Sequence, residues 1–126
     1  MARAGNSVAL IVRGDHLRAI RRKGLRIQGP LGHFTVSPRV TDDPASLGPV
    51  DLVLYTVKTY HNREAIPQTR PLVGPNTTVL SLQNGAESWK QLQSGLAAGH
   101  VLPATIYIEV SIQTPGVIRQ QGAVRR

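Results

Sequence analysis

Three short runs of aliphatic and β-branched residues, each followed by a helix-like stretch, limit what this chain can fold into more than any other feature. They cover residues 7–12, 51–58 and 77–82. The first two are nearly continuous in apolar residues, as expected for central strands covered on both faces of a parallel sheet. Because strand-like and helix-like segments alternate, we predict an α/β fold with a mostly parallel sheet.

The stretch after the first run has the signals of one short helix and a hairpin. Asp15 can cap a helix that Gly24 closes. Residues 25–27 and 34–36 then alternate in polarity around a Gly-Pro pair, which predicts two paired strands. Residues 41–49 contain proline turns, and we expect a loop or a one-turn helix there.

Proline and glycine punctuate the second half of the chain. Pro67 and Pro71 predict a broken helix, because each lacks a backbone donor and clashes with the preceding turn. A Gln-Asn-Gly turn at 83–85 leads into a helix with its large apolar residues on one face. Residues 101–112 are β-rich, and a Pro-Gly pair at 115–116 turns the chain back, which predicts a C-terminal β-hairpin.

Length and composition favour one modest core. The chain has 126 residues, 40% of them hydrophobic, and we expect one domain over residues 1–126 without a second domain. It has no cysteine, which excludes disulfides and thiol chemistry, and its four histidines are scattered, so we expect no metal site. No run approaches the ~20 apolar residues that span a bilayer, and no signal peptide is recognised. We therefore expect a cytoplasmic protein without membrane contact.

The net charge of +8 makes nucleic-acid binding an alternative to be weighed. Five basic residues fall within residues 18–26, and three more lie in residues 119–126. No aromatic residue lies inside either cluster, whereas a platform for single strands needs rings among the cations. We favour a solvated basic helix, or a patch for an anionic cofactor, over nucleic-acid binding.

Three polar residues follow the predicted parallel strands. Arg13 ends the first strand, Lys58 ends the second, and Asn84 comes just after the third. Since ligands of open parallel sheets bind beyond the carboxyl ends of the strands, the three side chains are expected to face one crevice. Each has a plain alternative: Arg13 and Lys58 as the first exposed residues after a strand, Asn84 as part of a turn that needs a positive φ. Their coincidence favours a binding site.

Arg13 favours NADP over NAD as the cofactor of that crevice. In dinucleotide-binding folds an acidic residue at the end of the second strand bonds the ribose 2′-hydroxyl, whereas an arginine accommodates a 2′-phosphate. Here the predicted strand at residues 7–12 ends in Val-Arg-Gly, and the nearest carboxylate is Asp15. A guanidinium also matches the geometry of a phosphate.

Four stretches together carry a resemblance to a known family. They are ARAGNSVALIVRGDHLRAIRRKGLRI, VTDDPASLGPVDLVLYTVKTY, LVGPNTTVLSLQNGAES and VLPATIYIEVSIQTPGVIRQQG. In order and spacing they resemble the nucleotide-binding domain of the ketopantoate reductase (2-dehydropantoate 2-reductase) family, over nearly the whole chain. The resemblance implies an incomplete Rossmann-like, NADP-binding, three-layer domain with a C-terminal hairpin.

The resemblance also implies roles for four residues. Arg13 matches the arginine that meets the 2′-phosphate of NADPH, and Lys58 matches a lysine near the cofactor. Asn84 matches an asparagine that touches both the cofactor and the 2-keto acid substrate, and Val110 matches a position whose backbone lies by the cofactor. The family reaction is the NADPH-dependent reduction of 2-dehydropantoate to (R)-pantoate in pantothenate and coenzyme A biosynthesis, although relatives reduce other 2-keto acids.

The chain departs from the family pattern at both ends. The Gly-rich loop and first strand that open family members are absent, about 20 to 25 residues of a ~30-residue βαβ unit. The family's catalytic lysine and glutamate lie in a helical domain that does not appear in the sequence, so we assign no catalytic residue and expect the isolated chain to be inactive. Lys58 as a substitute acid is disfavoured, because the half of the protein that forms the substrate pocket is lacking.

The absent strand has a structural consequence. In the usual strand order it lies between the strands that end at Arg13 and Lys58, so two central edges are left unpaired. We therefore expect a homodimer or a higher oligomer that pairs through these edges. A non-catalytic, dimeric interaction module derived from the cofactor domain is the alternative function.

Overall fold

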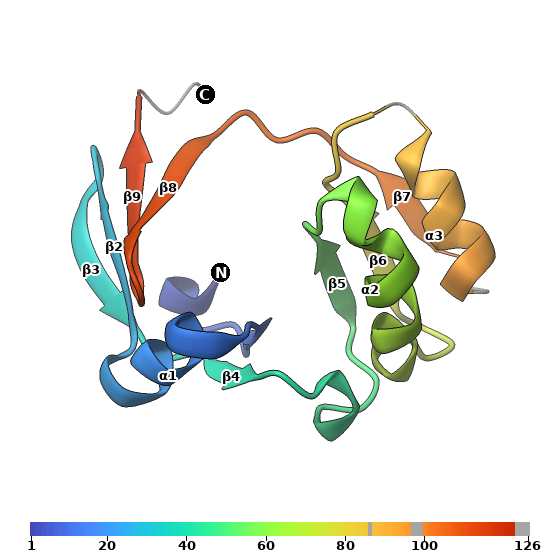
Figure 1. The fold of residues 1–126 in the computed structure, drawn as a ribbon, viewed down its shortest axis with the longest axis horizontal. Helices are drawn as coiled ribbons and strands as arrows, with labels where there is room; N and C mark the ends of the chain where they lie inside the picture. The colour runs from blue at the N-terminus through green and yellow to red at the C-terminus, as the bar shows by residue number, and fades with distance from the viewer. Residues whose placement is uncertain (86, 97–99, 123–126) are drawn as a thin grey trace. The chain divides into compact units, whose positions relative to one another are not determined.

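The computed structural model describes residues 1–85, 87–96 and 100–122. The chain forms two compact units (Figure 1). Unit 1 contains residues 1–42 together with the chain from residue 107 onward, and unit 2 contains residues 43–106. The expectation of one domain over residues 1–126 stays a prediction.

Unit 1 combines one α-helix with two small sheets among its described residues. Its elements are η1 (Ala2–Ala4), β1 (Ala9–Ile11), α1 (Gly14–Lys23), β2 (Leu25–Gly29), β3 (Gly32–Val36), β4 (Arg39–Thr41), β8 (Glu109–Thr114) and β9 (Val117–Gln121). Strand β1 pairs in parallel with β4. The other sheet has the order β3-β2-β9-β8, in which β2 and β9 are parallel and the two hairpins are antiparallel. Both predicted hairpins are confirmed.

The start of α1 differs from the sequence expectation. The N-cap position is Arg13, and no side chain caps the helix. Asp15 lies in the first turn and forms an ion pair with Arg18 instead. The reason is Gly14, whose φ of +60° lets the chain turn into the helix before Asp15 is reached. Gly24 closes the helix as predicted, with φ +74°.

The prediction that residues 7–12 form a central strand covered on both faces is wrong. Strand β1 has only three residues, and β4 is its one strand neighbour within the described part of the chain. Ile11 is 40% exposed, so the strand is not covered on both faces. Strand β4, which the sequence analysis did not predict, supplies the pairing.

Unit 2 is built on a three-stranded parallel sheet. Its elements are η2 (Pro44–Ser46), β5 (Leu52–Tyr55), η3 (Thr59–His61), α2 (Asn62–Thr69), η4 (Arg70–Leu72), β6 (Thr78–Ser81), α3 (Ser88–Leu96) and β7 (Val101–Pro103). The sheet order is β5-β6-β7, with both pairs parallel, so the expected mixed α/β fold with mostly parallel pairing is confirmed. The broken helix is also confirmed, since α2 passes Pro67 and gives way to η4 after Thr69.

The hydrophobic core of unit 2 lies between the sheet and its two α-helices. Buried residues of the three strands, of η4 and of α3 form one cluster, and residues of α2 pack against it: Val53, Tyr55, Leu72, Val79, Leu92, Leu96 and Val101 are buried, with Ala65 and Ile66 at its margin. Figure 1 shows α2 and α3 on the same side of the sheet. The core therefore supports the strand ends from one face.

The opposite face of the same sheet corrects a second expectation. Residues 51–58 were predicted to be covered on both faces, but Leu52 and Leu54 are 38% and 42% exposed while Val53 and Tyr55 are buried. The side chains alternate because α2 and α3 cover one face only.

The expectation of two unpaired edges is confirmed among the described residues, because β1 pairs only with β4 and β5 only with β6.

The β-rich run at 101–112 is divided rather than continuous. It supplies β7 in unit 2 and β8 in unit 1, with no regular strand at residues 104–108. None of the helices among the described residues is long and apolar enough to cross a membrane.

Candidate functional site

The carboxyl ends of β5 and β6 lie side by side in unit 2, because the two strands pair in parallel with Tyr55 opposite Ser81. Beyond the ladder, the backbone N–H of Leu82 donates to the carbonyl of Tyr55 at 2.9 Å. Lys58 follows β5 and Asn84 follows β6, and both side chains are exposed. The structure thus brings these two predicted site residues to the same edge of one sheet.

A buried side chain, Gln83, joins the two strand-end segments. Its Nε2 donates to the carbonyl oxygen of Val57 at 2.6 Å and to Oδ1 of Asn62 at 2.6 Å. Val57 directly precedes Lys58, and Gln83 directly precedes Asn84. The side-chain amide of Gln83 therefore links the two backbone segments that carry Lys58 and Asn84.

Asn62, the first residue of α2, completes the connection. Its Oδ1 also accepts from the Tyr55 hydroxyl at 3.2 Å, and its Nδ2 donates to Oε1 of Gln83 at 3.3 Å and of Gln91 at 2.9 Å. Asn62 is buried, and these bonds use both of its donors and both acceptor directions. Burial raises the pKa of the Tyr55 phenol to about 12, so it remains a hydrogen-bond donor at neutral pH.

The turn after β6 is shaped by glycine. Gly85 has φ +106°, a left-handed conformation that the Asn-Gly turn was predicted to need. The Ser88 hydroxyl donates to the Gly85 carbonyl at 3.0 Å, and α3 begins at Ser88. Asn84 is therefore exposed on a turn held between a strand and a helix.

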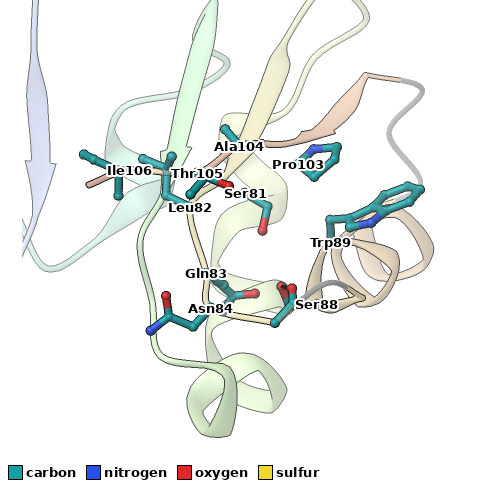
Figure 2. Close-up of a pocket in the computed structure, with 11 residues that line it drawn as sticks. Ser81, Leu82, Gln83, Asn84, Ser88, Trp89, Pro103, Ala104, Thr105 and Ile106 are labelled. Carbon is teal, nitrogen blue, oxygen red and sulfur yellow. Dashed lines mark hydrogen bonds between the residues drawn. The ribbon is translucent and has the colours of Figure 1, made fainter. Parts of the chain in front are cut away.

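A pocket of about 240 Å³ lies beside this turn (Figure 2). The pocket is lined by residues that end or follow β6, begin α3, and end or follow β7. They are Ser81, Leu82, Gln83, Asn84, Gly85, Ser88, Trp89, Pro103, Ala104, Thr105 and Ile106. In Figure 2 the Asn84 carboxamide points away from the side chains of Ser88 and Trp89. The donor and acceptor of Asn84 are thus directed to the open side of the turn.

Arg13 and Val110, the other two predicted site residues, belong to unit 1. Arg13 is exposed and occupies the N-cap of α1, directly after β1. The residue beside it, Gly14, leaves open space where a side chain would start. Val110 lies in β8 opposite Gln120 and is 49% exposed. A crevice shared by Arg13, Lys58 and Asn84 stays a prediction.

The described residues include no cluster of three or more histidine, aspartate or glutamate side chains that could hold a metal ion. The predicted site residues contribute a guanidinium, an ammonium and a carboxamide. These groups suit an anionic ligand with carbonyl or amide groups rather than a cation.

Sequence reasoning missed Gln83 and Asn62. A signal for Gln83 was present in the sequence, because residues 77–83 alternate and place Val79, Ser81 and Gln83 on the same, buried face. A polar residue in a buried series needs a hydrogen-bond partner. No comparable pattern identified Asn62, whose partners come from elements distant in the sequence.

Comparison with known proteins gives one consistent result. The family model "Ketopantoate reductase PanE/ApbA" matches residues 1–125. The 2-dehydropantoate 2-reductase of Caulobacter vibrioides is 36% identical over 99 residues, which cover 79% of this chain and 34% of that protein. The enzyme of the same name from Pyrococcus horikoshii is 30% identical over 97% of this chain and 39% of its own length.

A solved structure agrees with the sequence comparisons. The PanE/ApbA family ketopantoate reductase of Ralstonia eutropha JMP134 superposes with a TM-score of 0.90 at 36% identity, covering 96% of this chain and 40% of that one. The chain thus spans about two fifths of the length of these relatives, and its fold is that of their Rossmann-like part.

Proposed function

Because this chain belongs to the ketopantoate reductase family, we propose that it forms the cofactor-binding part of an NADPH-dependent 2-dehydropantoate 2-reductase. Reduction of a 2-keto acid in pantothenate and coenzyme A biosynthesis is the corresponding reaction. The observation that carries this proposal is that Lys58 and Asn84 follow two paired parallel strands whose ends are joined through Gln83.

The surroundings of Arg13 support the choice of NADPH over NADH. Arg13 is exposed at the N-terminus of α1, where no side chain caps the backbone amides, and an anion is favoured at such a terminus. The one carboxylate in that first turn, Asp15, is neutralised by Arg18. These residues fit a 2′-phosphate, with Arg13 as its guanidinium partner.

Asn84 is proposed to contact both cofactor and substrate. Its carboxamide offers a donor for a keto oxygen and an acceptor for an amide group, and the Gly85 turn fixes where these atoms lie. The exposed ammonium of Lys58 adds positive charge at the same end of the sheet. The bound nicotinamide supplies the hydride of the reaction, while these side chains bind and orient.

We propose cofactor binding without turnover for the 126 residues taken alone. Reduction of a keto group needs a proton donor within hydrogen-bond reach of the forming alkoxide. The family resemblance assigns that work to a lysine and a glutamate of a helical domain outside these residues, and it gives Lys58 a role in cofactor binding instead.

The test is a titration of the chain with NADPH, followed by nicotinamide fluorescence, with NADH in parallel. We expect saturable binding that prefers NADPH, and Arg13→Ala should weaken it by about tenfold or more, the loss of one charge-assisted contact. Arg22→Ala, at the other end of α1, removes the same charge and should change the affinity little. Absence of NADPH binding, or equal weakening by both variants, would contradict the proposal.

A second candidate, self-association, is favoured by the open strand edges. Strand β5 has one neighbouring strand among the described residues, and Leu52 and Leu54 on it are exposed. Unpaired edges of this kind are templates for pairing with a second chain. We propose a homo-oligomer through the β5 edge, either accompanying cofactor binding or, in the interaction-module alternative, replacing it.

Sedimentation velocity distinguishes these cases. We expect the chain to sediment as a dimer or larger species and Leu54→Lys to shift it to the monomer, because charge on an edge strand opposes pairing. Leu102→Lys, an equally apolar and exposed position on the other edge strand of the sheet, should leave the oligomer intact. A monomeric parent chain would rule out this second candidate.

A further inference from the structure

The orientation of the Gln83 amide is determined by a backbone group. A carbonyl oxygen can only accept, so the contact with Val57 must come from Nε2 of Gln83. The second N–H of the same nitrogen then points at Oδ1 of Asn62. It follows that Nδ2 of Asn62 faces the side-chain oxygens of Gln83 and Gln91, as observed.

The network has one satisfied arrangement. Tyr55 comes from β5, Asn62 from α2, Gln83 from the end of β6 and Gln91 from α3. Rotating the amide of Gln83 or Asn62 by half a turn would place donor against donor or acceptor against acceptor in a buried setting, at a cost for each unmade bond. Four elements of unit 2 are therefore locked together at the carboxyl edge of its sheet.

Lys58 and Asn84 each follow directly on a residue of this network. Val57 supplies the carbonyl that Gln83 binds, and Gln83 itself precedes Asn84. If one of these segments moves without the other, the bond between Gln83 and Val57 is lost. We propose that Gln83 is a positioning residue that couples Lys58 to Asn84, so that the two bind a ligand as one unit; this rests on the proposed cofactor-binding function of that edge.

The other end of the same sheet, where β5 and β6 begin, provides a matched control. There the buried Thr77 hydroxyl donates to the carbonyl of Val50 at 2.5 Å and accepts from the N–H of Gly74 at 2.8 Å. Thr77 thus links the segments that enter β5 and β6, as Gln83 links those that leave them. Thr77→Val costs stability in the same unit without touching the residues that follow the strands.

Amide hydrogen exchange of the labelled 126-residue chain tests the coupling without a ligand. In Gln83→Met, which keeps length but not hydrogen bonds, we follow the amides of His61 and Leu82, which donate to the carbonyls of Lys58 and Tyr55. We expect exchange of these two amides to accelerate together by about tenfold, the loss of one buried bond. In Thr77→Val the two amides should be no faster than the rest of unit 2. Equal acceleration in both variants, or none in Gln83→Met, would overturn the proposal.

A milder variant keeps the test decisive if Gln83→Met does not fold. Gln91→Met removes only the outermost acceptor of the network, at an exposed position of α3. A smaller but still joint acceleration of the His61 and Leu82 amides is expected. Acceleration of only one of them would contradict the coupling.

The NADPH affinities of single and double variants provide the functional test of the coupling. In the parent chain the effects of Lys58→Ala and Asn84→Ala should be non-additive in the double variant, and in the Gln83→Met background they should become additive. If the parent binds no NADPH, the cofactor proposal fails while hydrogen exchange still decides the coupling. If the parent binds and the two backgrounds show the same additivity, the positioning role of Gln83 fails and the cofactor proposal stands.

Discussion

The backbone N–H of Gly116 donates a hydrogen bond to Nδ1 of His16 at 2.9 Å, across 100 positions of sequence. His16 lies in α1, and Gly116 lies in the turn between β8 and β9 with φ +81°. Since a backbone N–H can only donate, Nδ1 of His16 is the acceptor. This bond attaches the C-terminal hairpin to the helix that follows Arg13.

Loss of that bond should destabilise unit 1. In His16→Leu the buried Gly116 N–H is left unpaired, which costs about 1–3 kcal/mol. Urea unfolding measures the loss, and faster hydrogen exchange of the Gly116 amide locates it. His33→Leu, on the exposed part of β3, is the control and should change neither quantity. An unchanged Gly116 exchange rate would mean that another group replaces the imidazole.

Removal of Asn62 should be among the most destabilising changes in unit 2. Asn62→Leu leaves the Tyr55 hydroxyl and one N–H of Gln83 buried without partners, at about 1–3 kcal/mol for each group. Gln91→Leu removes a single, partly exposed acceptor and should cost less than half as much. Urea unfolding of both variants makes the comparison, and similar costs would show that water reaches the network.

Tyr55 should make stability fall at alkaline pH. Burial raises its pKa to about 12 from the ordinary 10.0, so the folded chain holds the phenol proton more tightly than the unfolded chain. This contribution is fully present below pH 10 and is lost as the pH rises through about 12. Unfolding free energies measured across that interval should depend on pH less steeply in Tyr55→Phe.

Tyr60→Phe provides the matched control for that titration. Tyr60 is 77% exposed and is not buried with the network. Its substitution should leave the alkaline slope of the parent chain unchanged. A slope that responds equally to both substitutions would argue against a buried Tyr55 phenol.

Gly95 should not tolerate alanine although it lies within α3. Alanine in a helix is normally better than glycine by about 1 kcal/mol. Here the added methyl group would come within 2.5 Å of Cγ2 of Ile66 in α2, and overpacking costs about 1–3 kcal/mol. We expect Gly95→Ala to destabilise the parent chain.

The sign of the Gly95 effect should reverse when its neighbour is shortened. In an Ile66→Ala background the space for the methyl group exists, so Gly95→Ala should stabilise the chain through helix propensity. Thermal unfolding of the four chains in this cycle gives the comparison. Destabilisation in both backgrounds would point to a cause other than the approach of α2 and α3.

Patterns local in the sequence predicted most of the elements. The turns at Gly85 and Gly116 require positive φ, and glycine meets that need with few alternatives. The helix with Leu92 and Leu96 on one face, the two hairpins and the broken helix before Leu72 followed from periodicity and proline. Lys58 and Asn84 were placed at one sheet edge because parallel strands bring their carboxyl ends together.

Coverage of the strands could not be predicted in the same way. The apolar runs at 7–12 and 51–58 have the composition of doubly covered strands, yet Ile11, Leu52 and Leu54 are substantially exposed. An apolar composition shows that a strand is able to be buried on both faces. Whether it is buried depends on which strands and helices lie against it. The same holds for Asp15, which the preceding Gly14 displaces from the capping position.

The sequence by itself determined the family, the parallel α/β pattern and the identity of the polar residues that follow the strands, because each depends on residue type and spacing along the chain. The tertiary structure alone decided how two of those residues are connected. The bonds of Gln83 to Val57 and Asn62 join positions that are 26 and 21 residues apart. Such contacts depend on the packing of α2 and α3 against the sheet, and no local pattern encodes which buried amide will meet which partner.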